Sequence, residues 1–243
     1  MAQESLQEQM RGDVQRALRK PPEQRHWAMI VDVRKCVGCH ACTVACKAEN
    51  KTPPGVNYRT VKEAEVGTYP NVQRLFMPTL CMQCENPPCV KACKDGSITK
   101  GKDGVVRIDY AKNTGDPAVN KACPFGAMST DDGSYYTDGT PKREAYEDAD
   151  TFEYGVESDR KAKTGKNRKC HYCLHRLEAG MLPACVSTCI AAANYFGDLN
   201  DPTSLVAQKA KEMGLYIFGA KFGTKPTTKY LGANDYHCAS CHD

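Results

Sequence analysis

The spacing of apolar residues predicts a helix near the start of the chain. Apolar side chains recur every four positions there, at Leu6, Met10, Val14 and Leu18. This period places them on one face of an amphipathic helix, which we expect to be stopped by Pro21 and Pro22 because proline cannot continue a helix. Such a helix is expected to dock its apolar face on a core or a partner rather than to lie on a membrane.

Three apolar runs predict short strands, at residues 27–32 (WAMIVD), 105–109 (VVRID) and 215–218 (LYIF). No run of about 18 apolar residues is present, so the sequence does not predict a membrane-spanning helix. Residues 129–169 are dominated by charge, Gly, Ser and Thr. Such a composition predicts a long surface insertion.

A second helix is predicted after residue 200. Asp201 is a good N-cap, Pro202 suits the first helical position, and Gly214 predicts a stop. We therefore expect a helix near 202–213.

The cysteines add a chemical pattern to these elements. The 243 residues include 15 cysteines, which fits either a disulfide scaffold or metal ligation. The count is odd, and neighbours two or three residues apart suit one metal centre better than disulfides between distant segments. The cysteines form four bursts and one single residue: Cys36, Cys39, Cys42 and Cys46; Cys81, Cys84, Cys89 and Cys93; Cys123; Cys170, Cys173, Cys185 and Cys189; Cys238 and Cys241.

The first burst has the spacing C-x2-C-x2-C-x3-C, a strong signal for 4Fe-4S clusters. Three thiolates within seven residues can hold three corners of a cubane, and the fourth cysteine points toward a different cluster. A zinc site is the alternative, but it needs only paired C-x-x-C elements. The second and the last four-cysteine bursts share this arrangement with a longer middle loop.

At this point the chain resembles a known family. The segments RKCVGCHACTVACKAEN, CMQCENPPCVKAC, KACPFGA and CHYCLHRLEAGMLPACVSTC are similar to the four cysteine groups of the iron–sulfur (beta) subunit of the dimethyl sulfoxide reductase superfamily, especially its polysulfide and tetrathionate reductase branch. The resemblance covers about residues 26–200. It implies an α+β fold of two interleaved bacterial-ferredoxin-like modules with long loops, an N-terminal helix and a C-terminal extension.

The resemblance also implies a ligand scheme. Groups one and four form one pair and groups two and three the other; within a pair, the fourth cysteine of each group ligates the sister cluster. The implied ligand sets are Cys36, Cys39, Cys42 and Cys189 for cluster 1; Cys170, Cys173, Cys185 and Cys46 for cluster 2; and Cys81, Cys84, Cys89 and Cys123 for cluster 3.

Group three departs from the family pattern. Asn113, Asp116 and Val119 stand where its first three cysteines belong, and only Cys123 remains. One cluster is therefore expected to be lost while its sister keeps four ligands. Cys93, which would have served the lost cluster, is expected to be a buried free thiol.

The resulting division of the chain has five parts. Module A comprises residues 26–60 and 160–200, and module B comprises residues 61–128. The remaining parts are an N-terminal helical extension, a polar insertion and a C-terminal helix with a motif-bearing tail, at 1–25, 129–169 and 201–243.

The tail contains the pattern C-x-x-C-H at Cys238, Cys241 and His242, which is the attachment signature of a c-type haem. The same pattern occurs at residues 36–40 within a cluster group, so the pattern alone is a weak signal. The tail cysteines lie outside every cluster group, which favours a haem with His242 as proximal ligand. The alternatives are a replacement iron or zinc site that uses Cys238, Cys241 and a nearby histidine, with or without Cys93, a disulfide, or an unbound tail.

These features indicate an electron-transfer subunit and not an enzyme. The resemblance implies a molybdenum- or tungsten-bis-pterin catalytic subunit on one side, and a polytopic quinone-reactive membrane anchor or a c-type cytochrome on the other. A stand-alone redox enzyme is the alternative from another class, but no glycine-rich dinucleotide loop, Ser–His constellation or H-E-x-x-H pattern is present. A zinc or nucleic-acid module is the third alternative.

Charge and targeting complete the expectation. The formal net charge of +4 is too small to indicate a nucleic-acid-binding surface. The first 22 residues have no apolar central region and no twin arginine, so no export signal is predicted. Because c-type haem is normally attached outside the cytoplasm, we expect a periplasmic protein, exported with a signal-bearing partner.

Overall fold

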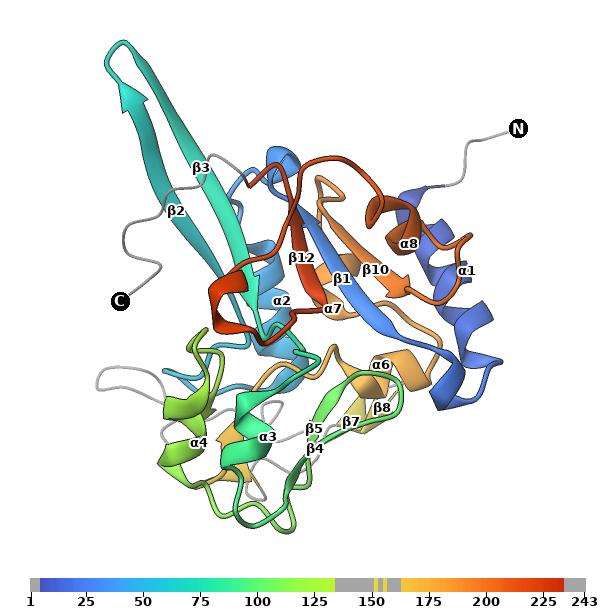
Figure 1. The fold of residues 1–243 in the computed structure, drawn as a ribbon, viewed down its shortest axis with the longest axis vertical. Helices are drawn as coiled ribbons and strands as arrows, with labels where there is room; N and C mark the ends of the chain where they lie inside the picture. Colours follow the sequence, from blue (N-terminus) through green and yellow to red (C-terminus); the bar gives the residue numbers. More distant parts are fainter. Residues whose placement is uncertain (1–4, 134–150, 153–154, 157–162, 234–243) are drawn as a thin grey trace.

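The computed structural model describes residues 5–133, 151–152, 155–156 and 163–233. This part of the chain mixes short helices with small sheets (Figure 1). None of its helices has the length and the apolar character that a bilayer-spanning segment needs.

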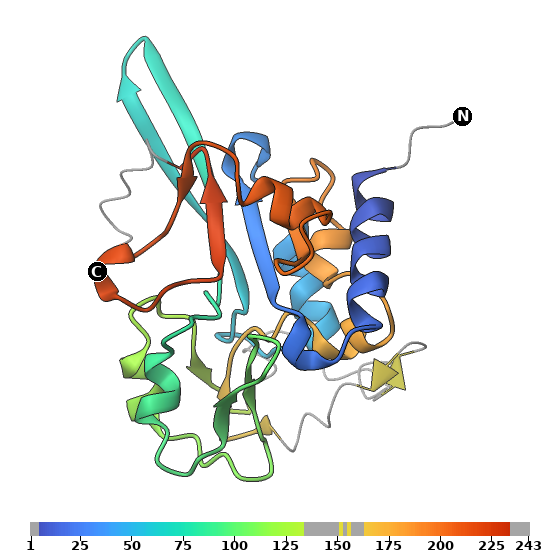
Figure 2. The ribbon, with the colours of Figure 1, turned by 45° about the vertical axis from the view of Figure 1, so that its right-hand side comes forward.

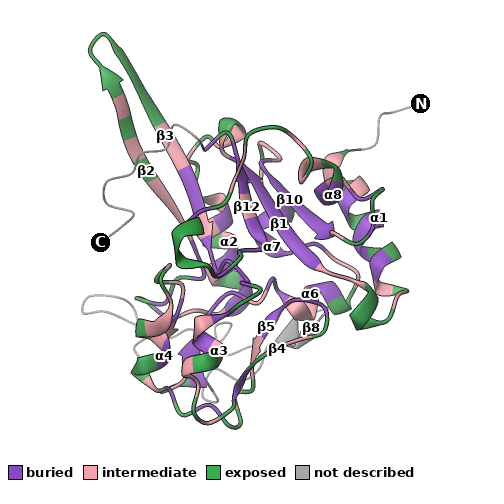
Figure 3. Ribbon diagram, in the orientation of Figure 1, coloured by how far each residue is buried: buried purple, intermediate pink, exposed green. Residues whose placement is uncertain are grey.

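A four-stranded sheet with the order β10-β1-β12-β11 forms the centre of the upper body. Strand β1 (Trp27–Asp32) runs antiparallel to β10 (Asn194–Asp198) and parallel to β12 (Thr228–Leu231), which in turn pairs with β11 (Leu215–Tyr216). All six residues of β1 are buried (Figure 3). A strand covered on both faces has a continuous apolar run rather than an alternating one, as the sequence of β1 has. The predicted strands at 27–32 and 215–218 are confirmed, the second in shorter form.

Helix α1 (Leu6–Leu18) packs against β10 and buries Met10, Val14 and Ala17. The helix begins with a capping box, in which the Ser5 side chain accepts a hydrogen bond from the Glu8 backbone and the Glu8 side chain accepts one from Ser5. The prediction that this helix docks on a core is confirmed.

The second predicted helix is shorter than expected. Helix α8 comprises Leu205–Lys209, and its N-cap is Ser204, whose hydroxyl accepts a hydrogen bond from Ala207 N. The predicted N-cap, Asp201, instead accepts hydrogen bonds from Thr203 and from Arg16 of α1. The prediction of a helix near 202–213 is therefore wrong in both bounds. The helix starts later because Asp201 forms a turn with Thr203, and it ends earlier, at Lys209.

A long hairpin projects from the body in both views (Figures 1 and 2). Its strands β2 (Arg59–Thr68) and β3 (Asn71–Leu80) pair antiparallel over their whole length. The outer half is exposed, whereas Arg59 and Leu80 at its base are buried (Figure 3). This hairpin was not predicted from the sequence.

The lower body consists of short elements. Helix α3 packs on α4, and two small strand pairs, β4–β5 and β6–β9, lie beside them. The predicted strand at 105–109 is present as β5. The bounds are α3 Pro88–Ala92, β4 Ile98–Lys100, β5 Val106–Ile108, α4 Pro117–Ala122, β6 Ser129–Thr130 and β9 Asn167–Arg168.

Three further helices contain or adjoin cysteines of groups one and four. Helix α2 (Ala41–Asn50) packs on α7 (Ala184–Ser187), and α6 (Leu174–Glu178) lies between α7 and the lower body in sequence. The remaining elements are the 3-10 turns η1 Pro22–Gln24, η2 Val33–Lys35 and η4 Ala220–Phe222, and the strands β7 Thr151–Phe152 and β8 Gly155–Val156.

The end of the expected surface insertion is buried. Asn167, Arg168 and Lys169 are each at most 1% exposed. Arg168 forms an ion pair of 2.6 Å with Asp131, and both side chains are fully buried. The expectation of a surface position is therefore wrong for residues 167–169, because their polar groups find partners inside the protein.

The buried Arg168–Asp131 pair gives a test of the fold. Replacing Asp131 with Asn removes the counter-charge of a buried guanidinium, which typically costs about 3–5 kcal/mol. We expect the thermal midpoint of unfolding to fall by roughly 6–20 °C. The control is Glu65→Gln, which breaks the exposed Arg74–Glu65 pair and is expected to change the midpoint little. Equal midpoints for Asp131→Asn and the control would contradict the assignment.

Candidate metal centres

The described cysteines are free thiols, and most are buried. All thirteen lie outside any disulfide, and Cys39 is the exposed member. Among the described residues no three His, Cys, Asp or Glu side chains close around a single metal ion. The cysteines instead gather around small cavities.

Cavity one is lined by cysteines from groups one and four. Its sulfur-bearing residues are Cys36, Cys39, Cys42 and Cys189, the set expected for cluster 1. Burial raises the pKa of the Cys36 thiol, and the neighbouring Cys42 and Cys189 raise it further. The backbone N–H of Ala193 donates a hydrogen bond to Cys189 Sγ at 3.3 Å.

The loop that presents the first cysteines is tight. Gly38 has φ +69°, and an added Cβ there would lie 2.3 Å from the Phe76 ring on β3, so only glycine fits. His40 is also left-handed, with φ 57°, and α2 begins directly after it. Cys42 and Cys46 consequently lie one helical turn apart on α2, on the same face.

A second set combines Cys46 of group one with Cys170, Cys173 and Cys185 of group four. Burial raises the pKa of Cys46 well above its ordinary value, and these three cysteines raise it further. The Asn50 side-chain amide lies 3.5 Å from Cys46 Sγ and 3.8 Å from Cys173 Sγ, as donor to both. The set expected for cluster 2 therefore meets in the fold.

A charged clamp also ties group one to group four. Glu49 of α2 pairs with His175 at 2.7 Å and with Arg176 at 2.8 Å, both on α6. These three side chains are nearly buried. The clamp holds α2 against α6, so that Cys46 stays beside the group-four thiols.

A further cavity, called cavity three after the cluster expected there, is lined by Cys81, Cys84, Cys89 and Cys123, the set expected for cluster 3. Burial and the neighbouring cysteines raise the pKa of Cys84 to about 12 and that of Cys89 to about 11. Cys123 is the C-cap of α4, which packs on α3. Prolines and apolar side chains complete the lining, namely Pro87, Pro88, Pro124, Phe125, Met128 and Val106.

The three sets are neighbours in a row. Burial raises the pKa of Cys185, and Cys42 of the first set raises it further. Burial also raises the pKa of Cys170 to about 12, with contributions from Cys185 and from Cys81 of the third set. Cysteines of the second set therefore lie close enough to cysteines of the first and of the third set to interact electrostatically with them.

Two buried cations lie beside these sets. Arg59 is 2% exposed and donates to Asn194 Oδ1 at 2.5 Å. Burial alone would lower its pKa, but the neighbouring sulfur groups of Cys185 and Cys42 raise it above its ordinary value. Lys169 is 1% exposed, donates to Cys170 O at 2.8 Å and lines cavity three.

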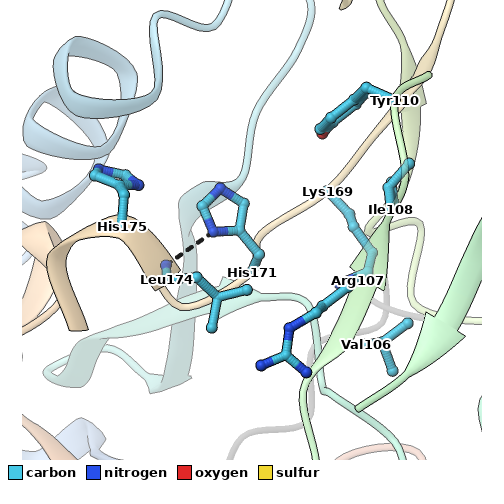
Figure 4. Close-up of a pocket in the computed structure, with 8 residues that line it drawn as sticks. All are labelled: Val106, Arg107, Ile108, Tyr110, Lys169, His171, Leu174 and His175. Atoms are coloured by element: carbon cyan, nitrogen blue, oxygen red, sulfur yellow. Dashed lines mark hydrogen bonds between the residues drawn. The ribbon is translucent and has the colours of Figure 1, made fainter. Parts of the chain in front are cut away.

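A pocket of about 240 Å³ lies on another side of Lys169 (Figure 4). Side chains of β5 and of the segment 169–175 line it. His171 Nδ1 accepts a hydrogen bond from Leu174 N at 3.0 Å, and burial lowers the pKa of His171 well below its ordinary value. The imidazole of His171 is therefore neutral near pH 7.

The donor sets fit 4Fe-4S clusters. Each set offers four cysteine sulfurs, the ligand type of such clusters. The raised pKa values of the buried thiols keep them protonated near pH 7, and they would lose their protons on binding iron. The nearby cations and N–H donors favour the resulting thiolates.

Comparison with known proteins agrees with this chemistry. The 4Fe-4S dicluster domain family matches residues 72–138 and 136–199. The B subunit of the selenate reductase of Mesobacillus selenatarsenatis is 50% identical over 91% of this chain and 77% of its own length. The B subunit of the tetrathionate reductase of Salmonella typhimurium is 33% identical over 87% and 74%, and the arsenate respiratory reductase iron-sulfur subunit ArrB of a Shewanella species is 32% identical over 84% and 94%.

The chain belongs to the iron–sulfur (beta) subunits of the dimethyl sulfoxide reductase superfamily. The predicted resemblance is confirmed, and so is the prediction that the chain is an electron-transfer subunit of an oxidoreductase complex rather than a catalytic one.

A buried polar network occupies the degenerate group three of this iron–sulfur subunit. Asn113, 1% exposed, donates to Ser97 Oγ and Asn167 Oδ1, and its own oxygen accepts from the backbone of Gly115 and Asn167. The Asp116 side chain caps α4, and Val119 packs in a small apolar cluster with Cys89. Asn113, Asp116 and Val119 are therefore engaged with protein groups.

Cys93 joins the same network. Its thiol donates to Asp95 Oδ1 at 2.9 Å and its sulfur accepts from Ile98 N at 3.2 Å. Cys93 is half-buried, not buried as predicted, and it forms no disulfide with another described cysteine.

Arg59 and Lys169 were not predicted from the sequence. Arg59 belongs to no motif, and in a sequence it is indistinguishable from a surface charge. Lys169 adjoins Cys170, which was an available signal. The C-terminal candidates Cys238, Cys241 and His242 lie outside the described residues.

The polar network around Asn113 can be tested by Asn113→Ala. The change removes four buried hydrogen bonds, and each group left unpaired costs about 1–3 kcal/mol, so the thermal midpoint should fall by several degrees. Iron and acid-labile sulfide per chain should stay unchanged, because Asn113 binds no cluster. A loss of iron without a loss of stability would contradict this role.

Proposed function

We propose that this iron–sulfur subunit passes electrons along three 4Fe-4S clusters held by the three cysteine sets. The observation that supports the proposal is that the fold gathers twelve of its cysteines into sets of four that adjoin one another in a row. When bound, each cluster accepts and releases one electron. The chain itself fixes the spacing, excludes water and supplies N–H donors to the sulfurs.

The proposed arrangement is two interleaved ferredoxin-like modules. The packing of α2 on α7 and the Glu49 clamp to α6 support the pairing of groups one and four. The packing of α3 on α4 supports the pairing of groups two and three.

The surface around cavity one favours contact with another protein of the complex. Cys39 is exposed, and the apolar side chains Val37 and Ile190 of the lining are 57% and 76% exposed. Val44 of α2 adds a third exposed apolar side chain. We therefore assign this end to a molybdenum- or tungsten-bis-pterin catalytic subunit, as electron transfer needs a centre close to the partner.

The opposite end, at cavity three, is assigned to the exit toward a membrane quinone-reactive anchor or a cytochrome. A c-type haem on Cys238, Cys241 and His242 would extend the chain of centres beyond cluster 3, where the fourth cluster of the family pattern is missing. With a haem attached, the protein would function on the periplasmic side in respiration, exported with a signal-bearing partner.

The sharing of cysteines between helices is tested by a matched pair of variants. Cys93 and Cys123 each cap the C-terminus of a short helix, α3 and α4. Cys123→Ala should remove a ligand of cluster 3, so that iron falls from about twelve per chain by one to four. Cys93→Ala should leave iron and sulfide unchanged.

The same pair of variants contains the contradictory outcome. The proposed ligand set is contradicted if Cys93→Ala loses iron and Cys123→Ala does not. Cys93, rather than Cys123, would then be a ligand of the cluster in the lower body. Electron paramagnetic resonance of the reduced protein identifies which signal is lost.

The haem is tested on the full-length chain. Covalent haem should survive denaturation and give sharp absorption bands, and Cys238→Ala together with Cys241→Ala should abolish them without changing the acid-labile sulfide. Iron or zinc bound to the unmodified tail, with no haem bands, would favour the replacement metal site instead.

A further inference from the structure

Arg59 is buried without a carboxylate partner. It is the first residue of β2, and among the described residues its guanidinium donates to Asn194 Oδ1 at 2.5 Å and to Met29 Sδ at 3.5 Å. A guanidinium is always charged. Leaving such a charge buried and unpaired is strongly unfavourable, so Arg59 needs a negative group nearby.

Lys169 is likewise a buried cation without a carboxylate partner among the described residues. Its ammonium donates to the carbonyl oxygen of Cys170, which carries no net charge, and no carboxylate in the described part of the chain pairs with it. The neighbouring Arg168 is different, because its guanidinium has the buried carboxylate of Asp131 at 2.6 Å. Among these three buried cations, Arg168 has a carboxylate partner. Arg59 and Lys169 lie instead beside the cysteine sets.

Each of the two cations adjoins two cysteine sets. Arg59 bonds to Asn194, which lines cavity one with the first set and donates to the backbone oxygen of Cys185 of the second set at 3.0 Å. Arg59 also lowers the pKa of Cys36 and of Cys46, one cysteine from each set. Lys169 lies beside Cys170 of the second set and lines cavity three with Cys89 and Cys123. One cation thus occupies each junction between neighbouring sets.

We propose that Arg59 and Lys169 are the internal counter-cations of the electron-transfer chain, one at the junction of clusters 1 and 2 and one at the junction of clusters 2 and 3. They act as positioning residues through the cluster thiolates. This inference rests on the proposed function. Each buried positive charge stabilises the more negative, reduced cluster and so raises its reduction potential.

The arrangement predicts which cluster responds to which residue. Cluster 2 lies between both cations, cluster 1 adjoins only Arg59, and cluster 3 adjoins only Lys169. Neutralising Arg59 should therefore lower the potentials of clusters 1 and 2, and neutralising Lys169 should lower those of clusters 2 and 3. A general loosening of the structure would not produce this crossed pattern.

The test is a redox titration of the full-length protein in its complex, followed by electron paramagnetic resonance. In Arg59→Gln and in Lys169→Gln, the reduction equilibrium constant of each of the two adjacent clusters should fall at least tenfold, which is about 59 mV for one electron. The third cluster should change much less. The charge-retaining variants Arg59→Lys and Lys169→Arg should stay near the wild-type potentials.

Lys91→Gln is the matched control. Lys91 lies on α3 two residues after Cys89 but is exposed, so water already screens its charge. Its removal should leave all three potentials within a small fraction of the shift seen for Lys169→Gln. An equal shift for Lys91→Gln would overturn the proposal, because burial would then not matter.

Other outcomes are equally decisive. If no potential moves, or if all three move together, the counter-cation assignment is wrong even though the wild-type protein contains its clusters. If Arg59→Gln fails to assemble clusters 1 and 2, recovery of their iron in Arg59→Lys supports the assignment and failure in both variants overturns it. A wild-type protein without three cluster signals would instead refute the proposed function.

Discussion

The first burst of cysteines in this protein reaches two places at once. Cys42 and Cys46 lie one turn apart on α2, yet Cys42 lines a cavity with Cys189 while Cys46 meets Cys170, Cys173 and Cys185. Such sharing constrains the fold strongly, because four sulfur atoms from two distant segments have to reach one small volume. Helix α2 must therefore pack on α7, and α3 on α4. Metal coordination would contribute folding free energy to these contacts.

Charge is the second constraint, and it follows from the first. Bringing four thiolates together in a buried volume is unfavourable without compensation. The backbone N–H of Ala193, the Asn50 amide and the two buried cations supply it. The same groups would be unfavourable in the absence of the sulfur ligands. Folding and cofactor binding are therefore coupled through electrostatics as well as through the ligands themselves.

Local patterns predicted local features well. The four-residue apolar period predicted α1, the apolar run at 27–32 predicted β1, and the cysteine spacings together with the family resemblance predicted which thiols meet. The hairpin β2–β3 was missed because its outer half projects from the body, and the first four residues of β3 are all exposed, so that burial imposes no alternation on them. Arg59, Lys169 and the Asn113 network were missed for a different reason. Their burial depends on segments far away in sequence, and a charged or amide side chain carries no local mark of it.

Under the proposed scheme, group three lacks a cluster and is held by hydrogen bonds instead. Asn113 bonds to Asn167, and Cys93 bonds to Asp95. Cys123 lines the neighbouring cavity with Cys81, Cys84 and Cys89, where the proposed scheme makes it a ligand of cluster 3.

The most direct test of shared ligation is anomalous scattering from iron in crystals of the complex. We predict three four-iron centres in a row, with Cys123 bound to the third and no iron beside Asn113 or Cys93. A fourth cubane near Asn113, or a Cys123 sulfur without iron, would contradict this prediction.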